Sequence, residues 1–376
     1  MKMWLEEIKQ EKSHILEINT IQMRNWLMTL TVKPHYSLVT RILVDLFLNG
    51  ELPTIQDITI EPQYGYAVRI AYKNGAVRLF KGSNIGINPS GSQEIVKDKG
   101  YTKYFLERLG YQTPPGKVFL LPQYVYELDK SLVKYAFQGH NTIEQIADYI
   151  TSALDYPCFI KPNEGSRGKG VNKCWERNDL EAILADYQAK HIERILVEQA
   201  VAWSEYRVVV LQDEMIACYQ RRPLSIEGNG TATIKELLQR AQRVFESTQR
   251  TALIDMDDIS IAQQLARKHY QLETILPEGV SYPVYEVANL SKGGVIEDYT
   301  EKISPYWRAL CITVAAQMGL AFCGVDIACS NIEDAHAEYS ILELNGSPGL
   351  DNYAASGEKQ YMRMRMFYKK IFEAVD

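Results

Sequence analysis

Two apolar segments toward the C-terminal end of the sequence carry side chains that suit a divalent metal ion. Asp326 stands in Cys323-Gly-Val-Asp-Ile327, and Glu343 and Asn345 stand in Ile341-Leu-Glu-Leu-Asn345. Residues two apart on a strand point to one face of a sheet, so Glu343 and Asn345 are predicted to lie side by side. Mg²⁺ prefers oxygen ligands of this kind and often shares them with phosphate oxygens. We expect a magnesium site here, with Mn²⁺ as an alternative ion.

The Glu-x-Asn pair alone is weak evidence, because polar residues at a strand end often lie in an ordinary turn. Its position strengthens the metal interpretation. It follows the segment that contains Asp326, and it precedes the turn sequence Gly346-Ser-Pro-Gly349.

A strand-like segment ending at Lys161 leads into the glycine-rich stretch 164–170. Backbone N–H groups of such a loop, together with a lysine ammonium group, suit the phosphates of a nucleotide. The stretch is neither a Walker A loop nor a Rossmann fingerprint. A flexible surface turn is the alternative, and we favour ATP because Lys161 directly precedes the loop. The loop residues expected to contact ATP are Gly165, Ser166, Gly168 and Gly170.

Two further segments suit the rest of a nucleotide and its reaction partner. The backbone from Glu198 to Ala200 is expected to hydrogen-bond adenine, and Glu205 is expected to contact the ribose hydroxyls. Taken alone, each acid is more often a plain surface charge. Arg221 and Arg222 precede a proline and suit a phosphate or a carboxylate, although a solvated charge pair explains the dipeptide equally well.

Helices and strands alternate irregularly along the chain, which predicts an α/β (α+β) fold. Asn74-Gly75 between two alternating segments predicts a β-hairpin. Thr233 to Phe245 reads as a helix that begins with a capping box formed by Thr233 and Glu236. The expected domains are an N-terminal α+β domain (1–96), two ATP-binding subdomains (97–200) and a C-terminal subdomain (201–376). The last contains a helical insertion at about 231–285.

Composition restricts the class of protein. The chain has 376 residues, 46% of them hydrophobic, and a net charge of −6 without a basic block, which argues against nucleic acid as a partner. The longest apolar stretch, residues 309–325, is interrupted by Gln317 and Gly319, so we expect no membrane span. The six cysteines form no C-x-x-C pair, and no signal-peptide pattern begins the chain. We therefore expect a cytoplasmic protein with reduced thiols.

Together the motifs resemble the ATP-grasp superfamily of carboxylate–amine ligases. The greatest likeness is to the ATP-grasp part of cyanophycin synthetases and of bifunctional glutathione synthetases, and it covers about residues 94–350. The motifs that carry the resemblance are Asp98-Lys99 with Thr102-Lys103, Thr113-Pro-Pro-Gly, Arg221-Arg-Pro with Thr233-Ile-Lys-Glu-Leu, Asn289-Leu-Ser-x-Gly-Gly and Glu343-x-Asn-x-x-Pro-Gly.

The resemblance implies two α+β subdomains that clamp ATP, and it assigns roles to single positions. Lys103 and Lys161 would be the ATP-binding lysines, and Arg221 or Arg222 would hold the reacting carboxylate or acyl phosphate. The other implied contacts are Glu198, Ala200 and Glu205 with adenosine, and Asp326, Glu343 and Asn345 with magnesium, where Asn345 also counts as catalytic.

The chain departs from the family pattern near the substrate. Lys292 stands where the family's glycine loop has threonine, and we include it among the candidate catalytic residues. Tyr285-Glu286 replaces the family's basic residues before that loop, and Asn229 replaces an aspartate. These departures leave the nucleotide site intact but leave the substrates open.

The resemblance implies a ligase that forms an amide (peptide) bond through an acyl phosphate and releases ADP and phosphate. Its substrates would be amino acids or small peptides, and a homodimer or homotetramer is common in the superfamily. A kinase on the same fold and a non-catalytic ATP-binding regulator are the alternatives. Residues 1–90 match no pattern that we recognise.

Overall fold

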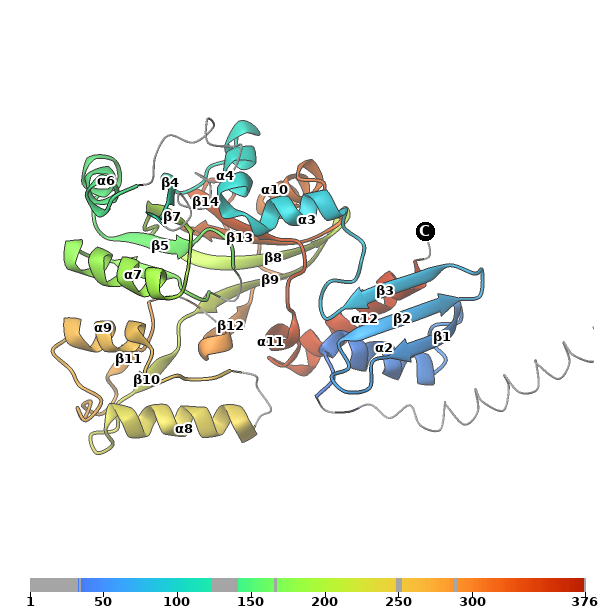
Figure 1. Cartoon of the computed structure of the whole chain (residues 1–376). Helices are drawn as coiled ribbons and strands as arrows, with labels where there is room; N and C mark the ends of the chain where they lie inside the picture. Colours follow the sequence, from blue (N-terminus) through green and yellow to red (C-terminus); the bar gives the residue numbers. More distant parts are fainter. Residues whose placement is uncertain are drawn as a thin grey trace, which may run out of the picture. The chain divides into compact units, whose positions relative to one another are not determined.

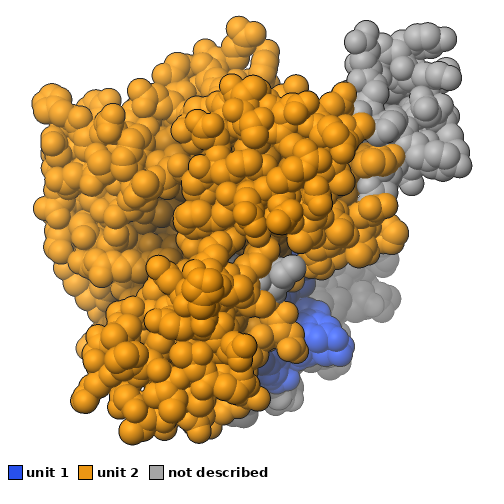
Figure 2. Space-filling model, turned by 90° about the vertical axis from the view of Figure 1, so that its left-hand side faces the viewer, with its two compact units in different colours: residues 1–86, 362–376 blue, residues 87–361 orange. Residues whose placement is uncertain are grey.

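The computed structural model describes residues 33, 35–122, 141–165, 168–247, 252–286, 288 and 290–374. The chain forms two compact units (Figures 1 and 2). Unit 1 comprises residues 1–86 and 362–376, and unit 2 comprises residues 87–361. The sequence-based division at residues 96 and 200 stays a prediction. The structure differs from it in grouping the last helix, from Met362 onward, with the N-terminal residues.

Unit 1 contains a three-stranded antiparallel sheet, β1 (Ile55–Ile60), β2 (Ala67–Tyr72) and β3 (Val77–Lys81), together with helix α2 (Leu38–Leu48). The predicted hairpin is confirmed, because β2 pairs with β3 from Ala71–Val77 outward. Gly75 at the turn has φ +90°, a conformation that glycine adopts without steric cost.

The C-terminal helix α12 (Glu358–Glu373) completes the core of unit 1. Phe372 is fully buried and stacks on Phe80 of β3 with 6.0 Å between ring centroids. Arg78 donates a 2.7 Å hydrogen bond to the carbonyl of Ile371, and Arg365 pairs with Asp45 at 3.0 Å. The first and last described parts of the chain therefore form one fold.

The described part of unit 2 contains a five-stranded antiparallel sheet in the order β12-β9-β8-β13-β14 (Figure 1). Its strands are β8 (Ser204–Leu211), β9 (Glu214–Arg222), β12 (Val295–Asp298), β13 (Phe322–Cys329) and β14 (Tyr339–Asn345). Helices α3 (Ser90–Lys97), α4 (Lys99–Arg108) and α10 (Pro305–Gln317) lie over the same part of the unit, and a short helix α11 (Asp351–Ala354) follows β14. Every residue of β13, an interior strand of this sheet, is buried.

A second sheet in unit 2 has the order β4-β7-β5-β6. Its strands are β4 (Gly116–Leu120), β5 (Cys158–Pro162), β6 (Asn172–Cys174) and β7 (Arg194–Gln199). Helix α6 (Ile143–Tyr149), its π-helical continuation η1 (Ile150–Leu154) and helix α7 (Arg177–Ala189) supply the core that packs on this sheet. We call this sheet with its helices the lid sheet. The glycine-rich stretch connects β5 to β6.

The third core of unit 2 belongs to the predicted insertion. The ribbon of β10 (Ser225–Glu227) and β11 (Ser281–Pro283) packs with helices α8 (Ile234–Ser247) and α9 (Ile259–Arg267), and a 3₁₀ turn η2 (Leu290–Lys292) follows. The capping box is confirmed, because Thr233 N–H donates to Glu236 Oε2 at 2.8 Å and Glu236 N–H donates to Thr233 Oγ1 at 3.2 Å. The apolar residues of α8 are not all buried, because Val244 is 56% exposed.

The architecture confirms a mixed helix and sheet fold. In the described part of the chain, no helix combines the length and the apolar character that a membrane crossing requires.

Trp307 on α10 joins the helix to the large sheet, and its replacement tests this core. The side chain is 1% exposed, its Nε1–H donates to the Asp334 carbonyl at 2.8 Å, and its ring lies 5.0 Å from that of Tyr339. Trp307→Ala is expected to lower the free energy of unfolding by about 3–5 kcal/mol because it leaves a cavity. Urea unfolding followed by circular dichroism measures this, and the exposed Tyr306→Ala is the matched control. Equal small effects of both variants would contradict the assignment of Trp307 to the core.

Candidate functional site

A row of charged side chains crosses the large sheet. Asp326 on β13 lies opposite Arg207 on β8 in one direction and opposite Glu343 on β14 in the other. Directly paired residues share a face of the sheet. Val208 and Val210 of β8 face the core with α10, so strand alternation places Arg207 on the opposite face. The row therefore lies on the face that α10 leaves uncovered.

Asp326 is fully buried and held by two arginines. Arg207 contacts both its carboxylate oxygens, with Nη2 at 2.7 Å from Oδ2, and Arg221 Nη2 lies 2.8 Å from Oδ2. Burial alone would raise the pKa of the Asp326 carboxyl, but the two guanidinium groups outweigh it and hold the pKa well below its usual range. Asp326 is therefore a permanent anion in this site.

Arg221 also pairs with Glu205, so one guanidinium bridges two acids. Burial raises the pKa of Glu205, and the nearby carboxylates of Asp326 and Glu343 add to this effect, although Arg221 opposes it. Removal of Arg221 would leave three clustered carboxyl groups with less compensation. Arg221 thus balances the negative charge of the predicted metal site.

Glu343 and Asn345 lie beside Asp326, as the sequence predicts. Asn345 Nδ2 donates to Glu343 Oε1 at 3.1 Å and lies 3.5 Å from Asp326 Oδ2. Two carboxylates and an amide from neighbouring strands are a donor set that fits a hard divalent cation, since Mg²⁺ completes its shell with phosphate oxygens and water. This set contains only two acids. Among the described residues, no group of three or more His, Cys, Asp and Glu side chains is arranged to hold a metal. Assignment of these residues as metal ligands stays a prediction.

Lys161 lies on the lid sheet in a buried ion pair with Glu198 of the neighbouring strand β7. The two residues are 7% and 5% exposed. Burial would lower the pKa of Lys161, but the carboxylates of Glu198 and Glu343 outweigh it and raise the pKa. Because Glu343 is among the carboxylates that raise this pKa, the lysine of the lid sheet lies within electrostatic range of the acidic row.

Lys99 joins the same charged region, although the sequence motif favoured Lys103. Its ammonium nitrogen lies 3.5 Å from the Gly165 carbonyl, at the root of the glycine loop. Burial lowers the pKa of Lys99, opposed mainly by the carboxylate of Glu343. Lys103 instead donates to Thr113 Oγ1 at 2.6 Å and pairs with Glu107 at 2.7 Å. Lys99 and Lys161 thus both lie within electrostatic range of Glu343, whereas Lys103 lies against the turn before β4.

The glycine loop has backbone conformations that other residues rarely adopt. Gly165, Gly168 and Gly170 have φ of +146°, +63° and +71°. A Cβ atom at Gly170 would come within 2.9 Å of Pro162, so a side chain there is sterically excluded. Ser166 lies outside the described residues. Its described part therefore depends on glycine at these positions, and its contact with phosphate stays a prediction.

The remaining predicted residues lie apart from this cluster. Arg222 pairs with Glu297 on the edge strand β12 and is more than half exposed. Lys292 pairs with Asp258, the residue that caps α9, and stacks over the Tyr285 ring at 4.9 Å. Ala200 directly follows β7, and its contact with adenine stays a prediction. Asn289 of the second glycine loop lies outside the described residues.

Sequence reasoning missed Arg207 and the position of Lys99. Arg207 stands in the apolar stretch Glu205–Leu211, two residues after Glu205. Strand alternation places these two residues on one face of the sheet. A single arginine in an otherwise apolar strand was the signal in the sequence that could have identified Arg207. Lys99 belongs to the motif Asp98-Lys99 with Thr102-Lys103. Because α4 begins at Lys99, this lysine, and not Lys103, lies beside the glycine loop.

Comparison with known proteins gives matches along most of the chain. The family model described as D-ala D-ala ligase C-terminus matches residues 130–271, and the RimK-like ATP-grasp domain model matches residues 286–361. Cyanophycin synthetase of Geminocystis herdmanii is 27% identical over 278 residues, which cover 70% of this chain and 29% of that protein. The glutathione biosynthesis bifunctional protein GshAB of Streptococcus mutans is 26% identical over 293 residues, or 72% of this chain and 35% of that protein. The chain thus spans about a third of the length of these relatives.

The solved structure of a bifunctional glutathione synthetase from Pasteurella multocida matches 90% of this chain and 45% of that chain, with a TM-score of 0.54 and 19% identity. The lid sheet with its buried lysine and the larger sheet with its acidic row are the two sheets of this α+β arrangement. The chain carries the ATP-grasp fold, on the evidence of the two family models and this structural match.

Proposed function

We propose that the protein is an ATP-dependent carboxylate–amine ligase that joins amino acids or small peptides through an amide bond. One observation carries the proposal: the buried Lys161–Glu198 pair of the lid sheet lies within electrostatic range of Glu343, which is part of the acidic row of the large sheet. Cationic groups on one side and metal-ligand oxygens on the other suit a nucleoside triphosphate with its divalent ion. The names of the relatives support amino acids or peptides as substrates.

Phosphoryl transfer needs little covalent help from a protein and depends mainly on positioning and charge neutralisation. Lys161 and Lys99 would contact the phosphates of ATP, and the glycine loop would donate backbone N–H groups to them. Asp326, Glu343 and Asn345 would hold Mg²⁺, or Mn²⁺ in its place, which when bound neutralises phosphate charge. The protein's own contribution is to hold these groups on two rigid sheets.

The bonds balance in two steps. A substrate carboxylate oxygen attacks the γ-phosphorus of ATP, and ADP leaves, which gives an acyl phosphate. The amine of the second substrate then attacks the acyl carbon, loses a proton, and expels inorganic phosphate to leave the amide. Arg221 lies beside Asp326 and is the residue we assign to the developing negative charge of the second step. Closure of the lid sheet would keep water from hydrolysing the acyl phosphate.

We also propose a cytoplasmic location, which the six buried cysteines with free thiols support, because disulfides are rare in that compartment. A homodimer or homotetramer stays a prediction.

The decisive experiment measures ADP release with ATP and Mg²⁺ over amino acids and dipeptides, offered singly and in pairs. We expect ADP release that needs two substrates, with a product whose mass is the sum of the two minus one water. A product that gains a stable phosphate would replace the ligase with a kinase. ATP binding without turnover in any combination would favour a non-catalytic ATP-binding protein.

A further inference from the structure

The lid sheet is bonded to the first turn of helix α4 through one buried asparagine. Asn163 directly follows β5, two residues after Lys161, and is 1% exposed. Its backbone N–H donates to the Arg194 carbonyl of β7 at 3.0 Å, and its own carbonyl accepts from Lys99 N–H at 3.0 Å. Its side-chain Oδ1 accepts from Gly100 N–H at 2.9 Å. Asn163 therefore joins β5 and β7 to the first two residues of α4.

Helix α4 itself belongs to the large sheet. Leu106 of α4 and Val96 of α3 are buried in the core that this sheet forms with α10. The later turns of α4 are thus packed on one sheet, whereas its first turn is bonded to the other. Lys99 lies in that first turn, and its ammonium nitrogen is 3.5 Å from the Gly165 carbonyl of the glycine loop. The position of Lys99 beside the loop therefore depends on how Asn163 holds the helix.

Close packing also fixes the start of α4. A Cβ atom at Gly100 would come within 2.6 Å of Val118 Cγ2 of β4 and 3.1 Å of Asn163 Oδ1. Glycine at this position therefore allows a close approach that a larger residue would prevent. Asp98, the N-cap of α4, adds an ion pair with Arg194 at 2.8 Å. Hydrogen bonds, an ion pair and packing thus act together at this end of the helix.

The amide group of Asn163 acts through its oxygen. In the described part of the chain, its Nδ2 is buried without a hydrogen-bond partner. An unpaired buried donor lowers stability, and a leucine would fill a similar volume without that cost. The acceptor for Gly100 N–H is therefore the contribution of Asn163 that an apolar side chain could not make.

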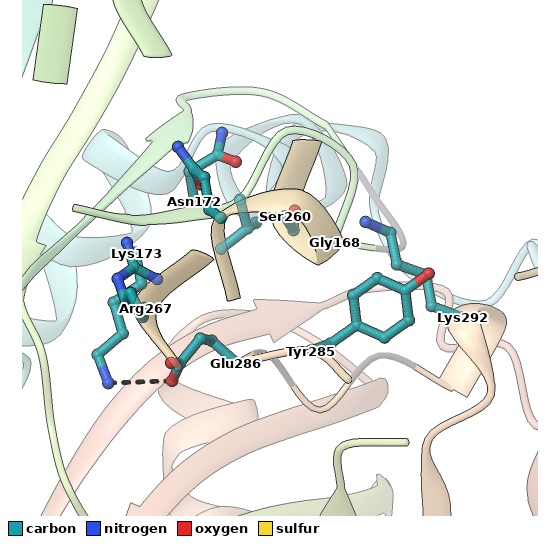
Figure 3. Close-up of a pocket in the computed structure, with 10 residues that line it drawn as sticks. Gly168, Asn172, Lys173, Ser260, Arg267, Tyr285, Glu286 and Lys292 are labelled. Atoms are coloured by element: carbon teal, nitrogen blue, oxygen red, sulfur yellow. Dashed lines mark hydrogen bonds and ion pairs between the residues drawn. The ribbon is translucent and has the colours of Figure 1, made fainter. Parts of the chain in front are cut away.

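The lid sheet also contacts the insertion and the segment after it, through ion pairs. Lys173 of the edge strand β6 lies 3.2 Å from Glu286, as the dashed line in Figure 3 marks. Arg267 of α9 lies 3.0 Å from Asp179 of α7. The side chains of both pairs are between 18% and 25% exposed, so water can replace a partner. Of these contacts, the one at Asn163 is shielded from water.

We propose that Asn163 is a positioning residue that acts through Lys99. By holding the start of α4 on β5, it keeps the ammonium group of Lys99 beside the glycine loop and at a set distance from that of Lys161. The inference rests on the proposed function, in which both ammonium groups would contact the phosphates of ATP. A cation that is held in place before binding loses less side-chain freedom when the phosphate arrives, so affinity rises.

A double-mutant cycle tests the dependence on Lys99. Binding of the non-hydrolysable β,γ-imido analogue of ATP with Mg²⁺ is measured by calorimetry for Asn163→Ala, Lys99→Ala and the combined variant. We expect Asn163→Ala to weaken binding about fivefold, the size of one hydrogen bond. In the Lys99→Ala background the same change should weaken binding less than about twofold, because the group that it positions is gone.

Asn141→Ala is the matched control. Asn141 Oδ1 also accepts a backbone N–H, from Leu120 at the end of β4 at 2.9 Å, but this bond does not involve α4. Its loss should leave the affinity for the analogue unchanged, with or without Lys99.

Gly100→Ala disturbs the same contact from the helix side. Its new Cβ atom should displace the start of α4 and weaken binding of the analogue. Val118→Ala removes the methyl group that this Cβ atom would meet, so the combined variant should recover most of the affinity. Circular dichroism checks the folding of each variant. If Asn163→Ala does not fold, the cycle with Gly100→Ala and Lys99→Ala decides in its place.

The proposal is overturned if Asn163→Ala weakens binding equally with and without Lys99, since that would be a structural effect unrelated to this lysine. Binding at the parent affinity in folded Asn163→Ala or Lys99→Ala would overturn it too. These results are separable from the ligase test. Coupled losses without ADP release in any substrate pair would refute the ligase and keep the positioning role. ADP release with uncoupled losses would do the reverse, and a parent that binds no analogue would refute both.

Discussion

Lys161→Ala is expected to reduce ATP-dependent ADP release by about 10²–10³-fold, the range seen when one group that stabilises transition-state charge is removed. The ammonium group is buried and paired with Glu198, so solvent cannot replace it. ATP affinity should fall with it, because the same cation would contact the phosphates before and during transfer. Steady-state ADP release and direct ATP binding are the two measurements.

The truncation also leaves Glu198 as a buried carboxylate without its partner, which by itself destabilises a protein. Lys161→Ala combined with Glu198→Gln removes this unpaired charge and separates loss of folding from loss of ATP binding. Lys190→Ala, an exposed lysine at the end of α7, is the control in the same subdomain. ADP release at the parent rate in a folded Lys161→Ala variant would show that Lys161 has no part in the reaction.

Glu343→Gln is the second replacement with a large expected effect. The change keeps the shape of the side chain and its contact with Asn345 but removes the charge that faces Lys161 and Lys99. We expect ADP release to fall about 10²-fold or more and the Mg²⁺ concentration for half-maximal activity to rise. The increase in ATP affinity that Mg²⁺ causes, measured without turnover, should become smaller in parallel.

Glu338→Gln is the matched control, because Glu338 is an exposed residue immediately before β14. Its Mg²⁺ requirement should equal that of the parent. If Glu343→Gln changed neither the rate nor the Mg²⁺ requirement, the metal site would have to lie elsewhere in the chain.

The acidic part of the site was predictable because it depends on local rules. Asp326, Glu343 and Asn345 stand at the ends of apolar segments, and the period of a strand decides which side chains share a face. The structure brings the three together through the antiparallel pairing of β13 with β14. Lys161 was found for the same reason, since it ends the apolar part of β5.

The choice between Lys99 and Lys103 was not predictable in this way, because it depends on where a helix begins. The resemblance assigned the ATP contact to Lys103, whereas α4 begins at Lys99 after the N-cap Asp98. Asp98 accepts a hydrogen bond from Tyr101 N–H and also pairs with Arg194 of β7. This tertiary contact fixes the first turn beside the glycine loop, and residues one turn later then face the start of β4.

Arg207 depends on a contact between distant segments. An arginine within a run of valines is unfavourable unless it finds a buried acid, and only the pairing of β8 with β13 supplies Asp326. Likewise, the ion pairs Lys173–Glu286 and Arg267–Asp179 join segments that are distant in the sequence. Neither periodicity nor a short motif contains that information.

The discontinuous chain of unit 1 has a consequence for synthesis on the ribosome. Arg78 and its hydrogen-bond acceptor Ile371 lie 293 positions apart, and Phe80 of β3 packs on Phe372. At roughly 5–20 residues per second, the nascent strands β1–β3 wait roughly 15–60 s for the helix that covers them. Unit 2 is synthesised in full during that interval and can fold from its own contacts first. The part of the protein that emerges first is therefore expected to reach its native state last.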